Sequence, residues 1–366
     1  MSYVTRKALF EQIENLRERP LISYVTSIRP NLSGQMAGDS IDHIIEQIQQ
    51  IPSDKREIDF LIISNGGDPI TALRIISLLR ERFDKIAVLL PYVAYSAAKI
   101  LSLGADEIIM HPYSNLGPVD PQLTVSRQAD NGQSAQLQFS SEDIRNYIDF
   151  VKTDVGITDQ DHLTSAFNAL AKEVGPLPIG SAKRSQQLSL SLSIKMLETH
   201  MEDKSKATSI AKALNTSYYH HGYAVSRSEA QNIGLNVITP DATLENLMWN
   251  VWQDYSAEMK CGHELNMVAA IMADPTAQAW MNSVNVINLP ANTPPQIAQN
   301  IIAAMAQNAA SMVPQPPIQL NELVASIESA RCAVAVHTTF NIVYWRDVNM
   351  ALAFNATAYS EGWKPV

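Results

Sequence analysis

The chain has 366 residues, which is enough for one large domain or two ordinary ones and too long for a lone small module. Hydrophobic residues make up 46% of it and charged residues 17%, so the composition supports a sizeable core and excludes a wholly disordered chain. The net charge of −10 argues against general binding to nucleic acid or to an anionic membrane, because both favour a basic face.

The first part of the chain alternates predicted strands and helices. Apolar stretches at 21–26, 59–64, 86–91 and 107–110 predict buried strands, and the segments 40–51, 70–83 and 96–103 are predicted as helices between them. Apolar strands joined through helices indicate a parallel sheet that is buried on both faces. From Ser141 to about Tyr255 the pattern is mostly helical. The sequence therefore predicts an α/β fold with a helical second half.

The composition changes near residue 262. Residues 1–262 carry 55 of the 64 charged residues, and no glycine stands between Gly262 and Gly362. We therefore predict a main domain over 1–260 and an additional C-terminal α+β region over 261–366, with a helix near 296–312 and strands within 331–359. Low charge with many Met and Ala residues suits a buried subunit interface, packing on the main domain, or recruitment of another protein.

Cysteine content and the N-terminal sequence exclude several classes of protein. The two cysteines, Cys261 and Cys332, cannot build a disulfide framework. His263 and Glu264 follow Cys261, but a second pair of ligands is missing, so we expect no metal and no cofactor. The N-terminal stretch is charged and amphipathic, and no window reaches about 18 apolar residues, so we expect a cytoplasmic protein with no membrane span. The sequence also lacks a phosphate-binding loop of the nucleotide-motor type.

Two turns stand between a predicted strand and a predicted helix. In the first, Ser64-Asn-Gly-Gly-Asp68, paired glycines leave backbone N–H groups uncovered, which suits an anion or a developing oxyanion. The same pair also fits a plain tight turn. In the second, Pro91 to Lys99, Ser96 begins a helix of small residues. A serine there serves either as a helix cap or as a nucleophile beside the exposed N–H of Ala97.

The order of the motifs resembles the serine dehydrogenase proteinase family, a relative of the signal-peptide peptidase A type within the Clp-protease/crotonase superfamily. The resemblance covers roughly residues 20–257. The matching segments are Tyr24-Val-Thr-Ser-Ile-Arg-Pro30, Ser64-Asn-Gly-Gly-Asp68, Ala94-Tyr-Ser-Ala-Ala98, Leu103-Gly-Ala-Asp-Glu-Ile-Ile-Met110, Asn115-Leu-Gly-Pro-Val-Asp-Pro-Gln122, His221-Gly-Tyr-Ala-Val-Ser-Arg227 and Glu229-Ala-x-x-Ile-Gly-Leu235.

The resemblance implies a Clp/crotonase-like parallel sheet with repeated ββα units. It also implies that Ser96 is a nucleophile and that Gly66, Gly67 and the N–H of Ala97 form an oxyanion hole. The predicted strand–turn–helix pattern agrees with this implied site, because turns that follow adjacent parallel strands converge at the carboxyl ends of the sheet.

Several residues are candidates for the general base that takes the proton of Ser96. Asp120 lies 24 residues after Ser96, where Clp proteases carry a histidine, and it suits either a base-orienting role or a turn. Signal-peptide peptidase A relatives use a lysine from a later helix, and Lys183 is the best placed of four such lysines; the others are Lys152, Lys172 and Lys195. His221 is the histidine that matches the family.

Lys99 departs from the family pattern, since the relatives have a small or hydroxyl residue there. It lies three residues after Ser96, on roughly the same helix face. A buried lysine at that place serves as a base if its pKa is depressed, and it abolishes catalysis if it fills the pocket.

These features predict a serine peptidase that acts on a peptide or protein substrate and assembles as a homo-oligomer, as the superfamily does. Two alternatives remain open. A crotonase-type acyl-CoA enzyme is possible on the same fold, although the net charge does not favour it. An inactive scaffold that binds a partner is consistent with Lys99 and with the missing base.

Overall fold

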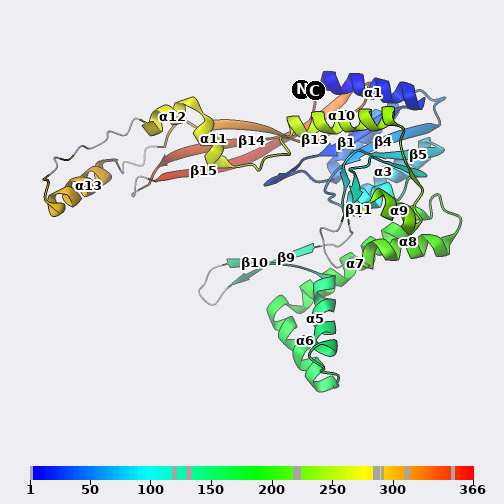
Figure 1. Cartoon of the computed structure of the whole chain (residues 1–366), viewed down its shortest axis with the longest axis horizontal. Coiled ribbons are helices and arrows are strands. Elements are labelled where there is room, and N and C mark those ends of the chain that lie inside the picture. Colours follow the sequence, from blue (N-terminus) through cyan, green and yellow to red (C-terminus); the bar gives the residue numbers. More distant parts are fainter. Residues whose placement is uncertain are drawn as a thin grey trace.

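An eight-stranded sheet runs through the computed structural model of the chain (Figure 1). Its order is β12-β7-β5-β4-β1-β13-β14-β15; the strands from β12 to β1 are parallel, and each later strand is antiparallel to its neighbour. The strands are β1 (Leu21–Thr26), β4 (Glu57–Ile63), β5 (Lys85–Leu90), β7 (Glu107–Met110), β12 (Val237–Ile238), β13 (Ile318–Glu328), β14 (Ala333–Arg346) and β15 (Leu352–Pro365). The structure describes residues 3–117, 122–128, 134–216, 224–282, 289, 292–309, 314–347 and 351–366.

The parallel strands are buried on both faces because their side chains alternate between two cores. On β4, Phe60 and Ile62 pack into one core, whereas Leu61 and Ile63 pack into the other. A strand that is covered on both faces carries a nearly continuous apolar run, as the sequence pattern predicts. The first face is covered by α2 (Ile41–Gln49), α3 (Pro69–Arg82), α4 (Ala97–Ser102), α7 (Pro176–Leu197), α8 (Lys204–Thr216) and α9 (Arg227–Ile233), and the second by α1 (Tyr3–Arg17) and α10 (Ala242–Glu258).

Short strands lie beside the carboxyl ends of the parallel strands. β6 (Val93–Ala94) pairs in parallel with β8 (Asn115–Leu116), which pairs antiparallel with β11 (Val225–Ser226). The order β5-β6-α4 is one ββα unit of the expected kind. The remaining elements of the body are β2 (Ile28–Arg29), β3 (Leu32–Ser33), a 3₁₀ helix (Gly38–Ser40), the hairpin β9 (Gln122–Gln128) and β10 (Ser134–Ser140), α5 (Ser141–Thr153) and α6 (Gln160–Val174).

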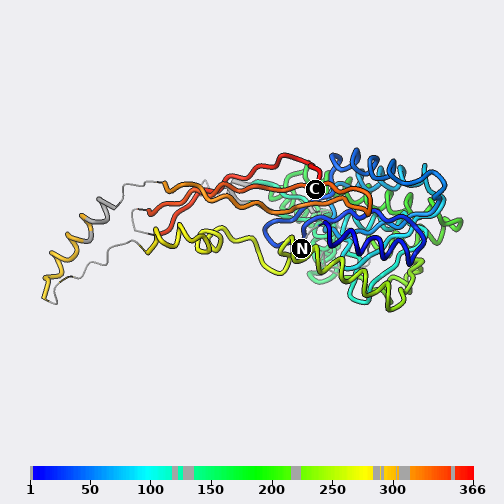
Figure 2. The backbone as a smooth tube through the Cα atoms, turned by 90° about the horizontal axis from the view of Figure 1, so that it is seen from above, coloured from blue at the N-terminus to red at the C-terminus, as the bar shows by residue number. Residues whose placement is uncertain are grey.

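The C-terminal strands leave the body as a long arm (Figures 1 and 2), which we define as β13, β14, β15 and the helices beside them. Only the end of β13 pairs with β1, at the register Ser23↔Glu328 to Thr26↔Ala325. Phe340 and Ile342 of β14 belong to a separate small core with Ile271. The arm helices are α11 (Met267–Ala273), α12 (Pro275–Asn282) and α13 (Pro295–Ala309).

The predicted fold class is confirmed, the predicted helix near 296–312 is present as α13, and the predicted strands within 331–359 are present as β14 and the first part of β15, which continues to Pro365. β13 was not anticipated, and it extends the main sheet across residue 260. The division into 1–260 and 261–366 stays a prediction drawn from composition. Among the helices that the structure describes, none combines the length and the apolar character needed to cross a membrane.

Candidate active site

The two motif turns meet at the carboxyl ends of β4 and β5. The N–H of Ser64 donates to the carbonyl of Val93 at 3.0 Å, and the N–H of Tyr95 donates back to the carbonyl of Ser64 at 2.9 Å. These bonds hold the glycine turn that follows β4 against the serine turn that precedes α4. The structure therefore brings together four of the predicted site residues, Gly66, Gly67, Ser96 and Ala97.

Ser96 has a backbone conformation that is rare for a residue with a side chain. Its φ is 48° and its ψ is −118°, immediately before the six-residue helix α4. Such a conformation costs about 1–3 kcal/mol and persists where the surrounding structure imposes it. The Ser96 side chain does not cap α4, and within the described part of the chain its hydroxyl has no hydrogen bond. The residue as a whole is half-buried.

Gly66 lets the backbone come close to this serine. A Cβ at Gly66 would lie 2.8 Å from the Cβ of Ser96 and 2.9 Å from the amide nitrogen of Ala97, and the φ of Gly66 is +102°. Both conditions require glycine. The N–H of Gly66 already donates to the Ser64 hydroxyl at 2.9 Å, and its carbonyl accepts from Met36 at 2.7 Å.

The N–H groups of Gly67 and Ala97 have no hydrogen-bond partner among the described residues. Met36 fixes the turn from behind, because its carbonyl accepts from the N–H of Asp68 at 2.8 Å. A Cβ at Gly67 would lie 2.2 Å from that same carbonyl oxygen, so no larger residue fits there. Asp68 itself caps α3 through the N–H groups of Ile70 and Thr71.

A buried hydroxyl pair supports the turn, and the sequence analysis did not single it out. The Thr26 and Ser64 hydroxyl oxygens are 2.7 Å apart, and both side chains are buried. Each residue stands at the end of a predicted apolar strand, 21–26 or 59–64. A hydroxyl at the end of an otherwise apolar strand was the signal that could have indicated a supporting role.

Lys99 is fully buried, and its Nζ donates to the carbonyl of Leu214 at 3.0 Å. Burial lowers the pKa of Lys99 to about 7, because the charged amine loses its hydration. No hydrogen bond joins Lys99 to the Ser96 hydroxyl in the described structure. The amine is thus held at the carbonyl of Leu214, near the end of α8, while Lys99 itself stands three residues after Ser96.

Replacing Lys99 by methionine is expected to change the pH dependence of stability. In the wild type the unfolded chain binds one more proton than the folded chain between about pH 7 and pH 10, so the free energy of unfolding gains ~1.4 kcal/mol per pH unit from this residue. The contribution ends below pH 7, where both states are protonated. Urea unfolding of both proteins at pH 7, 8 and 9 measures this slope, and parallel curves for the two proteins would contradict it.

In the part of the chain that the structure describes, no hydrogen bond joins any other candidate base to Ser96, and their catalytic roles stay predictions. All four candidate lysines are exposed: Lys152 on α5, Lys172 on α6, and Lys183 and Lys195 on α7. Asp120 and His221 lie outside the described residues. Among the described residues, no group of three His, Cys, Asp or Glu side chains is placed to hold a metal ion.

A parallel sheet that is covered on both faces, with a serine turn before a short helix at the carboxyl ends of its strands, defines an α/β protein. Residues 35–145, which contain both turns, match the family model of the ClpP-like SDH-type serine proteinase. This match confirms the resemblance that the sequence motifs indicate.

Two uncharacterized proteins of Methanocaldococcus jannaschii are similar to this chain. One is 27% identical over 198 residues, which are 54% of this chain and 59% of that protein. The other is 37% identical over 82 residues, which are 22% of this chain and 28% of that protein. The matches thus span less than two thirds of either relative.

Two solved structures of a membrane-bound stomatin-specific protease, both of mutants and one in complex with a substrate peptide, were also found. Each is 15% identical to this chain. The matches cover 63% and 62% of this chain and 84% and 77% of those chains, with TM-scores of 0.33 and 0.35.

Proposed function

We propose that the chain is a serine peptidase-like hydrolase whose nucleophile is Ser96. The observation that carries the proposal is the strained backbone of Ser96, whose hydroxyl and the N–H groups of Gly67 and Ala97 have no hydrogen-bond partner among the described residues. The hydroxyl oxygen attacks the carbonyl carbon of a peptide substrate, and the N–H groups of Gly67 and Ala97 donate to the resulting oxyanion. Loss of the amine leaves an acyl-enzyme, which water then hydrolyses. Gly66 contributes by leaving space, since its own N–H is engaged.

Lys99 is the candidate base that the described residues support best. Lys99 stands three residues after Ser96, and because its pKa is about 7, its amine is mostly neutral above pH 7. To take the proton of Ser96 it must first leave the carbonyl of Leu214. Lys99→Met is expected to slow acylation of Ser96, with the exposed Lys55→Met as the matched control. Unchanged acylation in Lys99→Met would move the role to Lys183, Asp120 or His221.

A fluorophosphonate probe tests the nucleophile directly. We expect an adduct that mass spectrometry places on Ser96 and that is absent from Ser96→Ala. Ser102→Ala is a suitable control, because that hydroxyl is buried on the same helix and donates to the carbonyl of Ala98. No adduct on the wild type would instead favour the inactive scaffold or an acyl-CoA enzyme, and an adduct that survives in Ser96→Ala would assign the nucleophile elsewhere.

A further inference from the structure

The outer edge of the arm is a long strand with a partner on one side only. β15 pairs with β14, and it is the last strand of the sheet. Its straight part runs from Leu352 to Ser360, because Glu361 and Gly362 stand together opposite His337 and form a bulge. Nine extended residues present an edge about 30 Å long. Along this edge the outward backbone N–H and C=O groups find no neighbouring strand in the described structure.

The segment Leu352–Ser360, which we call the β15 edge, lacks the features that protect free edges. It contains no charged residue, no proline and no glycine. Phe354 and Tyr359 are 39% and 45% exposed, and they lie on opposite faces of the strand. Monomeric proteins block such edges with charges, prolines or bulges, since a bare edge pairs with another chain. The only bulge lies at the end of this segment that is nearer the body.

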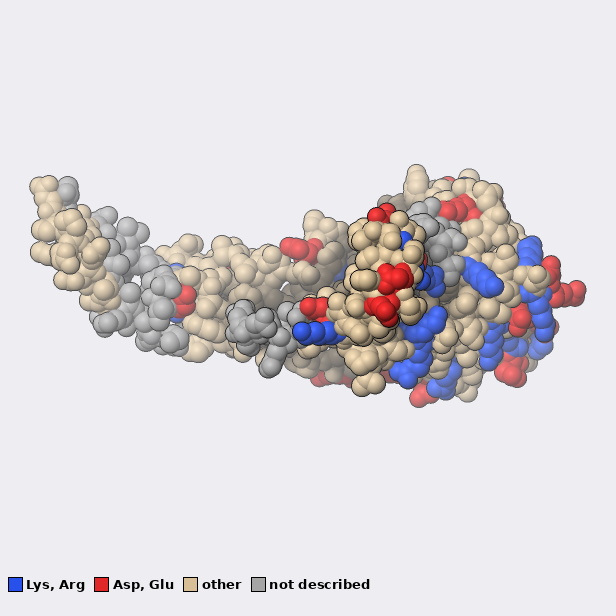
Figure 3. Space-filling model, turned by 90° about the horizontal axis from the view of Figure 1, so that it is seen from below, with Lys and Arg blue, Asp and Glu red and all other residues tan. Residues whose placement is uncertain are grey.

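The charge distribution favours an identical chain as the partner. Charged side chains gather on the body, whereas the visible face of the arm is nearly free of them (Figure 3). No charged residue occurs between Asp274 and Glu322 either. A strand that selects a different protein commonly carries charges that fit it. Two copies of an uncharged strand, in contrast, bring no like charges together.

We propose that the β15 edge pairs antiparallel with the β15 edge of a second copy of this chain, about a two-fold axis. The two sheets then become one continuous sheet, and about eight new backbone hydrogen bonds form between the copies. Because the arm projects from the body (Figure 2), antiparallel pairing places the two charged bodies at opposite ends of the joined arms. This association is independent of the chemistry at Ser96.

Molar mass in solution is the first test. We expect the wild type to have twice the 40.4 kDa of one chain by light scattering at micromolar concentration. The double variant Thr357→Lys/Tyr359→Lys sets four charges along the joined edges, and we expect it to have half the wild-type mass. Thr164→Lys/Asn168→Lys, on exposed positions of α6, adds the same charge elsewhere and is expected to leave the mass unchanged. A wild-type mass of one chain, or a dimer that persists in the β15 variant, would overturn the proposal.

Cross-linking tests the pairing without adding charge to the arm. Single cysteines are introduced at each position from 354 to 359 in a Cys261→Ser/Cys332→Ser background. A disulfide forms only where two Cα atoms approach to about 4.4–6.8 Å, so we expect a cross-linked dimer at one or two adjacent positions next to the two-fold axis. Circular dichroism of the lysine variant shows whether its arm stays folded. Absence of a cross-link at all six positions would refute pairing through this edge.

Discussion

Gly66→Ala is expected to lower the rate of acylation of Ser96 by roughly 10²–10³-fold, because a misplaced nucleophile or oxyanion donor costs about this much. The new Cβ would stand 2.6 Å from the carbonyl oxygen of Tyr95 and 2.9 Å from the amide nitrogen of Ala97. These are backbone atoms, so the serine turn itself must move. The second-order rate constant for fluorophosphonate labelling measures the loss.

Gly38→Ala is the matched control for this substitution. Nothing lies within 4 Å of a Cβ at Gly38, which does not have a positive φ. Its labelling rate is expected to equal that of the wild type. Gly66→Ala also stores strain at a φ of +102°, so its free energy of unfolding is expected to fall by about 1–3 kcal/mol. Equal labelling rates for the two variants would show that the glycine turn does not position Ser96.

The features that the sequence predicted are those that depend on neighbouring residues. The strands at 21–26 and 107–110 have the observed bounds, because strands that are buried on both faces are mostly apolar runs. The two turns were recognised for the same reason, since each stands where such a strand ends. That they meet follows from the parallel order of β4 and β5.

The features that the sequence did not predict join residues that are far apart in the chain. β13 pairs with β1 across about 300 residues, and no local pattern encodes this pairing. The contact of Lys99 with the carbonyl of Leu214 depends on how α8 packs against α4. The engaged N–H of Gly66 depends on a rotamer of Ser64. In each case the tertiary fold determines the partner, because the positions of the groups in the sequence are compatible with many partners.

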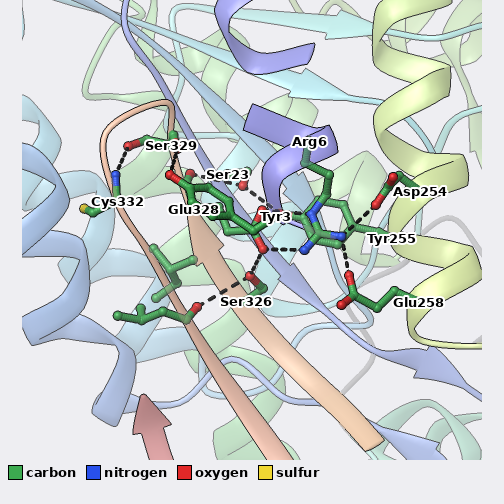
Figure 4. Close-up of polar contacts among 12 residues, drawn as sticks. Tyr3, Arg6, Ser23, Asp254, Tyr255, Glu258, Ser326, Glu328, Ser329 and Cys332 are labelled. Carbon is green, nitrogen blue, oxygen red and sulfur yellow. Dashed lines mark hydrogen bonds and ion pairs between the residues drawn. The ribbon is translucent and has the colours of Figure 1, made fainter. Parts of the chain in front are cut away.

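Arg6 is a buried residue whose partners are also far away in the sequence (Figure 4). It is 1% exposed and binds Glu328 of β13 through two hydrogen bonds, of 2.8 and 2.7 Å. It also donates to Asp254 of α10 at 2.7 Å and to Glu258, and its guanidinium lies 4.3 Å from the centre of the Tyr255 ring. One side chain thus ties α1 and α10 to the strand that carries the arm.

Arg6→Met is expected to lower the free energy of unfolding by about 3–5 kcal/mol, because it leaves the buried carboxylates of Glu328 and Asp254 without their cation. Arg56→Met is the matched control, since Arg56 and Asp84 form an ion pair that is exposed, and its stability is expected to stay near that of the wild type. Urea unfolding at pH 7 measures both.

A triple variant separates two contributions to the lost free energy of unfolding: the burial of carboxylates without a cation, and the loss of packing. Arg6→Met/Asp254→Asn/Glu328→Gln removes the arginine and the two more deeply buried of the three carboxylates that contact it, and Met occupies the same volume in both Met variants. If the unpaired buried carboxylates account for most of the loss, the triple variant regains a large part of the free energy of unfolding that Arg6→Met loses. This is expected although each further substitution removes another native group. If the triple variant is no more stable than Arg6→Met, the cost lies in the packing of Arg6 against Tyr255 and the strand, and the electrostatic account of this core is wrong.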